Sequence, residues 1–430
     1  MNASTSFPAP DELVNATDVE AAARKLQGIV THTPLQLCPR LSELTGARIW
    51  LKREDLQPVR SYKLRGAYHF LSALDESARQ RAVVAASAGN HAQGVAYACR
   101  LLGLTGRIYV PSTTPRQKRD RIRTLGSDRI ELVVVGETFD DAAEAAHADA
   151  QQTAAVLVPP FDHDLVIAGQ GTVAMEAVED LRREHGREAH TFVVPVGGGG
   201  LLAGCGAWLR ERMPSARIVA VEPSGAVSMA AALRADRPVT LHDIDRFVDG
   251  AAVRRVGERT FASAKAITPD MVSVDEGAVC TQMLQLYQVE GVIAEPAGAL
   301  AAAAVATGAA RIEPDTDVIV VVTGGNNDVS RYSEVLERSL VHEGLKHYFL
   351  VTFPQEPGAL RRFLDQVLGP DDDIVLFDYI KRNNRETGPA LVGLEISRKE
   401  DLDPLLTRML AVNMDIERID PTDPIYRYLT

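Results

Sequence analysis

The sequence has no long apolar segment, few cysteines and no excess of basic charge. No run of about 18 apolar residues occurs, the length that indicates a membrane-spanning helix, and the N-terminal MNASTSFPAPDELVNAT lacks the basic and apolar regions of a signal peptide. The formal net charge is −12, with lysine and arginine scattered along the chain, which argues against nucleic-acid binding. We therefore expect a soluble cytoplasmic protein with a small-molecule partner.

The cysteines are too few and too far apart for a disulfide framework. Cys38, Cys99, Cys205 and Cys280 also lack the spacing of a zinc site, so we expect buried, reduced thiols. In contrast, 46% of the 430 residues are apolar, enough for two or three domains with large cores.

Short β-branched runs alternate with longer helical patterns between residues 47 and 340. Apolar runs without polar alternation are typical of strands buried on both faces, as in a mainly parallel sheet covered by helices. We predict strands over 190–196, 217–222 and 317–323. Ligands of such folds bind at the carboxyl ends of strands, so we expect the site in the loops that follow.

The pattern changes near residues 338–346, where a smaller unit begins. The expected elements are a strand over 347–353, a helix over 358–368, strands near 373–381 and 390–396, a helix over 400–411 and a strand near 414–419. This βαββαβ order is the ferredoxin-like arrangement. We therefore predict a catalytic domain at 1–340 and a second domain at 341–430.

One lysine and three glycine-containing loops carry the candidate chemistry. Lys63 lies in RSYKLRGA at the start of a predicted helix, and taken alone it is a surface lysine with a packed stem. VGGGGLLAG, residues 196–204, follows a strand and opens a helix, so its backbone amides suit a phosphate, although a tight turn is the alternative. It matches neither the P-loop nor a complete dinucleotide-binding motif.

The other two loops also follow predicted strands. In ASAGNHAQG, residues 86–94, Ser87, Gly89 and Asn90 can donate to a carboxylate or a ring oxygen, or simply cap the helix. In VVTGGNND, residues 321–328, the hydroxyl of Thr323 lies where a cofactor edge could bind, although an ordinary turn is equally compatible.

Together and in this order, KREDLQPVRSYKLRGA, SAGNHAQG, GGGGL, EPAGA and TGGNND resemble the tryptophan-synthase-β-like group of pyridoxal-phosphate enzymes. Within this fold-type-II group, residues 20–340 are most similar to biosynthetic threonine dehydratases, also called threonine ammonia-lyases. The C-terminal residues resemble the single ACT-like regulatory domain of the shorter form. The resemblance implies an α/β fold with two mainly parallel-sheet lobes, followed by an α+β ferredoxin-like domain.

The resemblance also implies a role for each motif. Lys63 would bind pyridoxal 5'-phosphate covalently and, once substrate displaces it, take the α-proton. The implied phosphate ligands are Gly197, Gly198, Gly199, Gly200 and Leu201; the ring contacts are Asn90 and Thr323; the substrate carboxylate is held by Ser87, Ala88, Gly89, Asn90 and His91. The implied reaction converts L-threonine to 2-oxobutanoate and ammonia, the first committed step of isoleucine biosynthesis.

Three positions differ from patterns in related enzymes. Thr323 stands where threonine dehydratases often have serine, which keeps the hydroxyl and adds a methyl group. Ala88 stands where serine racemases have a serine, which favours elimination over racemisation. Glu222 belongs to a segment that binds a divalent metal in those racemases, but Ser228 replaces a carboxylate there, so we expect no required metal.

Two further features have alternative interpretations. Glu295 either caps the Ala-rich helix over 297–310 or lines the cofactor pocket, as the resemblance favours. Pro357 and Gly358 form a strand-to-helix turn that lies beside the amino-acid effector site in ACT-like domains. The resemblance implies feedback inhibition by isoleucine, with valine as an antagonist, in a homotetramer or homodimer; alternatively, the domain only pairs subunits.

Other functions share these motifs. A serine dehydratase, a serine racemase or a threonine synthase would belong to the same group, and L-serine is a second candidate substrate. A catalytically idle amino-acid sensor on this scaffold would need no amine nucleophile, so retention of Lys63 together with the glycine loop argues against it.

Overall fold

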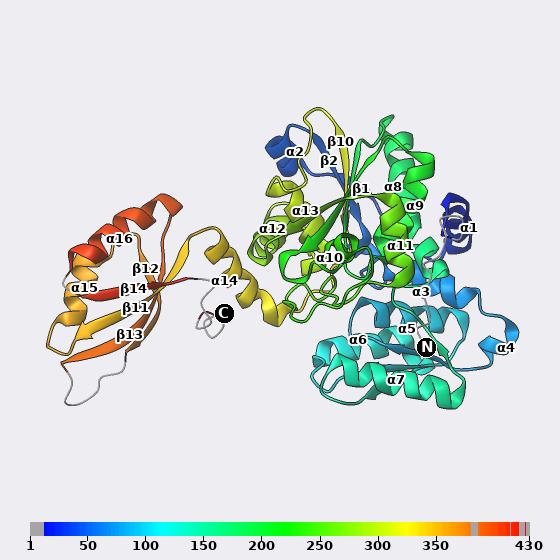
Figure 1. Cartoon of the computed structure of the whole chain (residues 1–430), viewed down its shortest axis with the longest axis horizontal. Coiled ribbons are helices and arrows are strands. Elements are labelled where there is room, and N and C mark those ends of the chain that lie inside the picture. Colours follow the sequence, from blue (N-terminus) through cyan, green and yellow to red (C-terminus); the bar gives the residue numbers. More distant parts are fainter. Residues whose placement is uncertain (1–12, 380–385, 413, 421–425, 427–430) are drawn as a thin grey trace. The chain divides into compact units, whose positions relative to one another are not determined.

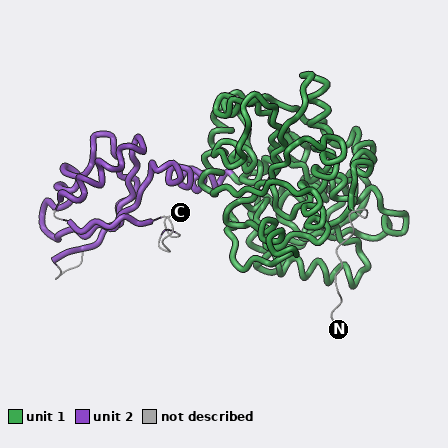
Figure 2. Tube along the Cα trace, turned by 45° about the horizontal axis from the view of Figure 1, so that its top comes forward, with its two compact units in different colours: residues 1–328 green, residues 329–430 purple. Residues whose placement is uncertain are grey.

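The computed structural model describes residues 13–379, 386–412, 414–420 and 426. The chain forms two compact units, residues 1–328 and 329–430, coloured separately in Figure 2. The predicted boundary after residue 340 falls inside helix α14 (Tyr332–His342) of the second unit. Among the described residues, no helix combines the length and apolar character needed to cross a membrane.

The first unit contains two sheets, one in each of two lobes (Figure 1). The larger sheet has the order β1 (Leu35–Leu37), β2 (Arg48–Arg53), β10 (Asp317–Val322), β7 (Thr191–Pro195), β8 (Arg217–Pro223) and β9 (Asp270–Val274). The smaller has the order β5 (Ile130–Val134), β4 (Gly106–Val110), β3 (Val83–Ala86) and β6 (Val156–Leu157). All pairs are parallel except β1 with β2, which confirms the predicted mainly parallel, two-lobed fold.

Helices cover both sheets, and their apolar faces build a separate core in each lobe. The helices are α1 (Ala16–Leu26), α2 (Pro39–Thr45), α3 (Lys63–Ser72), α4 (Glu76–Arg79), α5 (Asn90–Leu102), α6 (Arg116–Gly126), α7 (Phe139–Thr153), α8 (Asp164–His185), α9 (Gly200–Arg212), α10 (Ser228–Ala235), α11 (Glu258–Ile267), α12 (Glu276–Gln288) and α13 (Pro296–Ala306). In Figure 1, α8, α9 and α11 lie on one side of the larger sheet, and α12 and α13 lie on the other.

Helices α8 and α9 cross at backbone contact distance because glycines face each other. A Cβ atom on Gly204 would lie 2.1 Å from the carbonyl oxygen of Ile167, and one on Gly171 would lie 2.6 Å from the carbonyl oxygen of Gly204. Neither backbone can move aside, so the crossing requires glycine at both positions.

The second unit contains a four-stranded antiparallel sheet with two helices on one face (Figure 1). Its strands, in spatial order, are β12 (Asp373–Tyr379), β13 (Thr387–Glu395), β11 (Lys346–Pro354) and β14 (Asp415–Ile419); the helices are α15 (Ala359–Val367) and α16 (Leu402–Ala411). This order confirms the predicted ferredoxin-like arrangement. Residues 380 and 381 of the strand predicted near 373–381 lie outside the described residues.

The close contact between α8 and α9 can be tested by adding one methyl group at Gly204. We expect Gly204→Ala to lower the free energy of unfolding by about 1–3 kcal/mol, the usual penalty for overpacking. Thermal and urea unfolding, each with and without pyridoxal phosphate, would measure the change. Gln151→Ala on the exposed face of α7 is the control, since it adds no overlap, and equal stability of the two variants would contradict the tight crossing.

Candidate active site

Loops after three neighbouring strands meet at one edge of the larger sheet. The strands β2, β10 and β7 are adjacent and parallel, so the segments that follow them emerge together. The backbone N–H of Tyr62 donates to the carbonyl of Thr323 at 3.1 Å, and that of Gly325 donates to Arg60 at 2.9 Å. Ser61 forms an isolated bridge with Gly324, so the segment before Lys63 is joined to the 323–325 loop.

Lys63 is the first residue of α3, and its side chain is partly buried. The Nζ atom donates to the carbonyl of Pro160 at 3.0 Å and lies 5.4 Å from the centre of the Tyr62 ring. Burial lowers the pKa of Lys63 to about 8, although the negative charge of Glu295 acts in the opposite direction. This environment differs from that of a solvated surface lysine.

Asn90, Glu295 and Asn326 form a polar cluster close to Lys63. The amide of Asn90 donates to Glu295 Oε1 at 2.5 Å and accepts from Asn326 at 2.7 Å. Burial, with a contribution from the nearby Asp249 carboxylate, raises the pKa of Glu295 to about 7. Glu295 occupies the N-cap position of α13, but its side chain makes no capping hydrogen bond, so the capping alternative is wrong.

The glycine loop between β7 and α9 presents backbone amides at a helix N-terminus. Gly199 has a φ of 91°, in the left-handed region that favours glycine. Within the described part of the chain, the amides of Gly198, Gly199 and Gly200 have no hydrogen-bond acceptor. The carbonyl of Gly198 accepts from the Thr260 hydroxyl at 2.7 Å, which fixes the loop's orientation.

The loop after β3 supplies the remaining predicted ligands. The Ser87 hydroxyl accepts from the amide of Gly89 at 3.2 Å, so that part of the loop is bonded internally. The ring of His91 is buried and donates from Nε2 to the carbonyl of Val158 at 3.0 Å. Burial, with a contribution from the Lys63 charge, lowers the pKa of His91 to about 3, so the ring is neutral.

Comparison with known proteins extends over both units. Residues 26–324 match the family of pyridoxal-phosphate-dependent enzymes, and residues 337–429 match the C-terminal regulatory domain of threonine dehydratase. The chain is 59% identical to the biosynthetic L-threonine dehydratase IlvA of Mycobacterium bovis, over 97% of this chain and 96% of the relative. It is 48% identical to IlvA of Bacillus subtilis, over 93% of each chain. The chain belongs to the biosynthetic L-threonine dehydratase family.

Solved structures of related enzymes share the fold of this threonine dehydratase family member. Threonine deaminase isoform 2 from Solanum lycopersicum is 36% identical with a TM-score of 0.71, covering 78% of this chain and 90% of that chain. Maize serine racemase is 27% identical with a TM-score of 0.69, covering 76% of this chain and 98% of that chain. Dehydratases and racemases therefore share this framework, and the framework alone does not distinguish them.

The site fits pyridoxal phosphate, the cofactor of the family. Amides without acceptors at the start of α9 suit the phosphate, and an amine with a lowered pKa suits the aldehyde carbon. The hydroxyl of Thr323 is buried and donates to the carbonyl of Ala297 at 3.1 Å. Its bond to the pyridine nitrogen stays a prediction.

The segment between β6 and α8 contributes to the site although no sequence motif marks it. This segment contains Val158 and Pro160, which accept from His91 and Lys63, and Phe161, whose ring packs directly against Gly198. The only available signal was its place after a parallel strand, because proline and phenylalanine carry no ligand chemistry.

Glu222 caps a helix. Its Oε1 accepts from the amide of Met229 at 2.6 Å, and its Oε2 accepts from the amide of Ala230 at 3.0 Å, at the start of α10. Burial raises the pKa of Glu222 to about 7, although these two bonds oppose the shift. Both oxygens are therefore used within the fold.

The lowered pKa of Lys63 predicts a pH profile in the full-length chain without cofactor. We expect competitive acylation of Lys63, followed by mass spectrometry, to rise with a midpoint near pH 8, whereas an ordinary lysine titrates near 10.5. Glu295→Gln should lower the midpoint because it removes the charge that stabilises the ammonium form. A midpoint for Lys63 equal to that of the exposed Lys265 would contradict the buried environment.

The same shift links Lys63 to stability. Between pH 8 and 10.5 the unfolded chain holds the proton that the folded chain has released, so this group makes the cofactor-free protein more stable as pH rises through that window. Urea unfolding across this range, compared with Lys63→Met, would measure the difference. Parallel pH curves for the two proteins would contradict the expectation.

Proposed function

We propose that the protein is a pyridoxal-phosphate-dependent L-threonine ammonia-lyase, which produces 2-oxobutanoate and ammonia in isoleucine biosynthesis. The observation that carries this proposal is the partly buried Lys63 amine, which has a pKa of about 8 and bonds to Pro160. The next residue, Phe161, packs against the glycine loop, whose amides have no acceptor among the described residues. The names of its relatives support threonine as the substrate.

Different residues of the site bind the ligands and transfer the proton. When bound, pyridoxal phosphate supplies the electron sink for negative charge at the α-carbon. Residues 197–201 would hold the phosphate, Asn90, which bonds to Glu295, would orient the ring, and residues 87–91 would hold the substrate carboxylate. Lys63 in its neutral form removes the α-proton.

Loss of the α-proton and the β-hydroxyl, together one molecule of water, leaves an enamine that tautomerises to an imine. A water molecule then hydrolyses the imine to 2-oxobutanoate and ammonia. This route requires a base on only one face of the substrate. Ala88 supports elimination over racemisation because its methyl side chain has no proton to exchange. L-Serine, which has the same leaving group, is the expected second substrate.

Replacement of Lys63 tests the chemistry directly. We expect Lys63→Ala to form no detectable 2-oxobutanoate from threonine and to lose borohydride-stable attachment of the cofactor, since both need the amine. Lys265→Ala is the control, because Lys265 is exposed and pairs with Asp236 at 2.5 Å on the surface. Unchanged activity of Lys63→Ala, or interconversion of serine enantiomers without 2-oxo acid, would contradict the proposal.

We also propose that isoleucine inhibits the enzyme by binding to the second unit, with valine as an antagonist. A groove of about 500 Å³ lies there, lined by Thr352, Pro354, Glu356, Arg362, Gln366, Thr387, Val412, Met414 and Asp415. It begins beside the predicted effector turn at Pro357 and Gly358, although neither lines it. Arg362 suits a carboxylate, Asp415 suits an ammonium group, and Val412 suits an aliphatic side chain.

The neighbouring arginines of α15 provide a matched test of this groove. Arg362 lines the groove and pairs with Glu356, whereas Arg361 is 87% exposed and pairs with Asp365. We expect Arg362→Ala to raise the isoleucine concentration for half-inhibition while kcat without isoleucine is unchanged, and Arg361→Ala to change neither. Identical inhibition curves for both variants would contradict this location, and no response of the unsubstituted enzyme would contradict feedback control.

We further propose a homotetramer or homodimer in the cytoplasm, with catalysis in residues 1–340 and regulation in residues 341–430. Four free, buried cysteines support a reducing compartment. Exposed apolar side chains such as Leu410, Val289 and Leu360 support association between subunits.

A further inference from the structure

A buried set of charged side chains joins the helix that begins at Lys63 to helix α8. Arg65, two residues after Lys63, donates to both oxygens of Glu54 at 2.7 and 2.8 Å and to both oxygens of Glu176 at 3.1 Å. It also donates to the Thr172 hydroxyl at 3.2 Å. Arg65 is 1% exposed, so its five contacts replace water completely.

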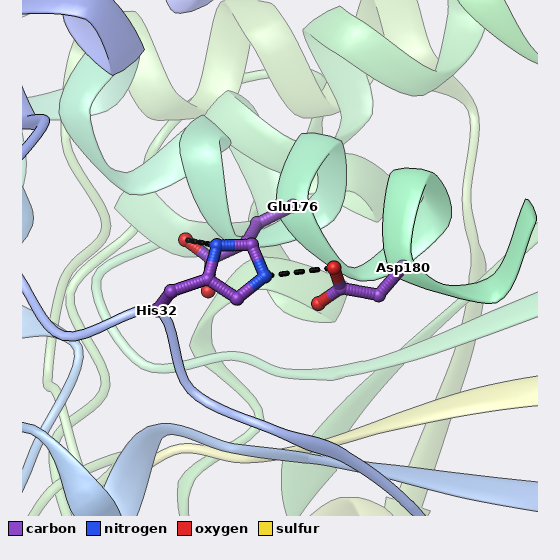
Figure 3. Close-up of side chains that lie close together, drawn as sticks. All are labelled: His32, Glu176 and Asp180. Atoms are coloured by element: carbon purple, nitrogen blue, oxygen red, sulfur yellow. Dashed lines mark hydrogen bonds and ion pairs between the residues drawn. The ribbon is translucent and has the colours of Figure 1, made fainter. Parts of the chain in front are cut away.

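A second buried cation, Lys52 of β2, shares the carboxylate of Glu176 with Arg65. It donates to Glu176 at 2.6 Å, to Asp180 at 3.4 Å and to the carbonyl of Thr33 at 2.6 Å. At the surface the network ends in His32, whose side chain is 54% exposed and bonds to Asp180 at 2.7 Å (Figure 3).

His32, Glu176 and Asp180 are residue types that bind metals, and they lie close together (Figure 3). However, the oxygens of Glu176 and Asp180 already accept from Lys52 and Arg65, among others. A divalent cation would meet the ammonium group of Lys52, and that repulsion disfavours binding. The cluster is therefore an ion-pair network.

Helix α8 also contacts the helices on both sides of the site at backbone distance. A Cβ atom on Gly169 would lie 2.7 Å from the carbonyl oxygen of Arg65, in α3. Two residues later, Gly171 packs equally closely against Gly204 of α9, the helix that begins at the phosphate-binding loop. Helix α8 is thus a common support for Lys63 and for the glycine loop.

We propose that Arg65 is a positioning residue, which holds the first turn of α3 on α8 so that the Lys63 amine stays aligned with the glycine loop. The proposal rests on the proposed function of Lys63. Arginine suits this role because its planar fork bonds two carboxylates and a hydroxyl in one fixed geometry, whereas lysine has a single ammonium group on a flexible stem.

Arg65→Lys keeps the positive charge but removes the planar guanidinium group. It therefore separates the effect of side-chain geometry from the effect of charge. We expect kcat for threonine to fall by about 100-fold, as for a catalytic group misplaced by an ångström, with little change in KM. In the cofactor-free chain, the acylation midpoint of Lys63 should rise from about 8 toward 10.5 as the amine gains water.

Arg107→Lys is the matched control. Arg107 donates two hydrogen bonds to Asp149, at 2.6 and 2.9 Å. It lies on β4 of the other sheet, away from α3 and α8. We expect its kcat and its Lys63 midpoint to equal those of the unsubstituted protein, even if its melting temperature falls.

Thr172→Val is a milder variant that carries the test if Arg65→Lys does not fold. It removes one bond to Arg65 and should change kcat and the Lys63 midpoint in the same directions, by less. The proposal would be overturned if Arg65→Lys left both kcat and the acylation midpoint of Lys63 unchanged. If only Thr172→Val folds, unchanged values in that variant would overturn it. Because the midpoint is measured without cofactor or substrate, it tests Arg65 even if threonine proves not to be the substrate.

Discussion

Removal of one lysine amine from water is the constraint on which the active site depends. A desolvated ammonium group is unfavourable, and the protein lowers the pKa of Lys63 to about 8 without neutralising the residue entirely. A hydrogen bond to the Pro160 carbonyl keeps the amine oriented, and the Glu295 charge limits the shift. The result is an amine that is both sufficiently neutral to react and held in one direction.

Rigid elements, not loops, determine where that amine lies. Lys63 begins a helix that three of the five bonds of Arg65 fasten to α8, and the glycine loop begins a helix that touches the same α8 through Gly171 and Gly204. Sites built on packed helices hold their groups more precisely than sites on loops alone. Glycine is needed at these positions because it has no side chain, so the helix backbones can approach one another closely.

Local sequence patterns were sufficient to predict the strands and the glycine loops, because both depend on neighbouring residues. Apolar runs predicted β7, β8 and β10 to within one residue, and the order of short elements predicted the ferredoxin-like unit. The contacts that complete the site could not be predicted in this way. These contacts join residues that are far apart in the sequence. The separation is 205 residues between Asn90 and Glu295, 97 between Lys63 and Pro160, and 111 between Arg65 and Glu176.

Glu295 illustrates why such contacts matter chemically. The sequence alone favours a helix cap, since a carboxylate at the start of a helix interacts favourably with the helix dipole, whereas the resemblance favours the cofactor pocket. In the fold its oxygen turns toward Asn90, and the cost of burial raises its pKa while burial lowers that of Lys63. The fold thus brings the two pKa values, normally six units apart, to about 7 and about 8.

This convergence determines the charge that the site presents to its ligands. Below pH 7 the glutamic acid is neutral and Lys63 is charged, so the pair carries one positive charge; above pH 8 the signs reverse, and the pair carries one negative charge. In the cofactor-free protein the anionic phosphate of the cofactor binds better in the first state, whereas proton removal by Lys63 requires the neutral amine of the second. Between pH 7 and pH 8 the two charges largely cancel, and a fraction of the Lys63 amines is already neutral for proton transfer.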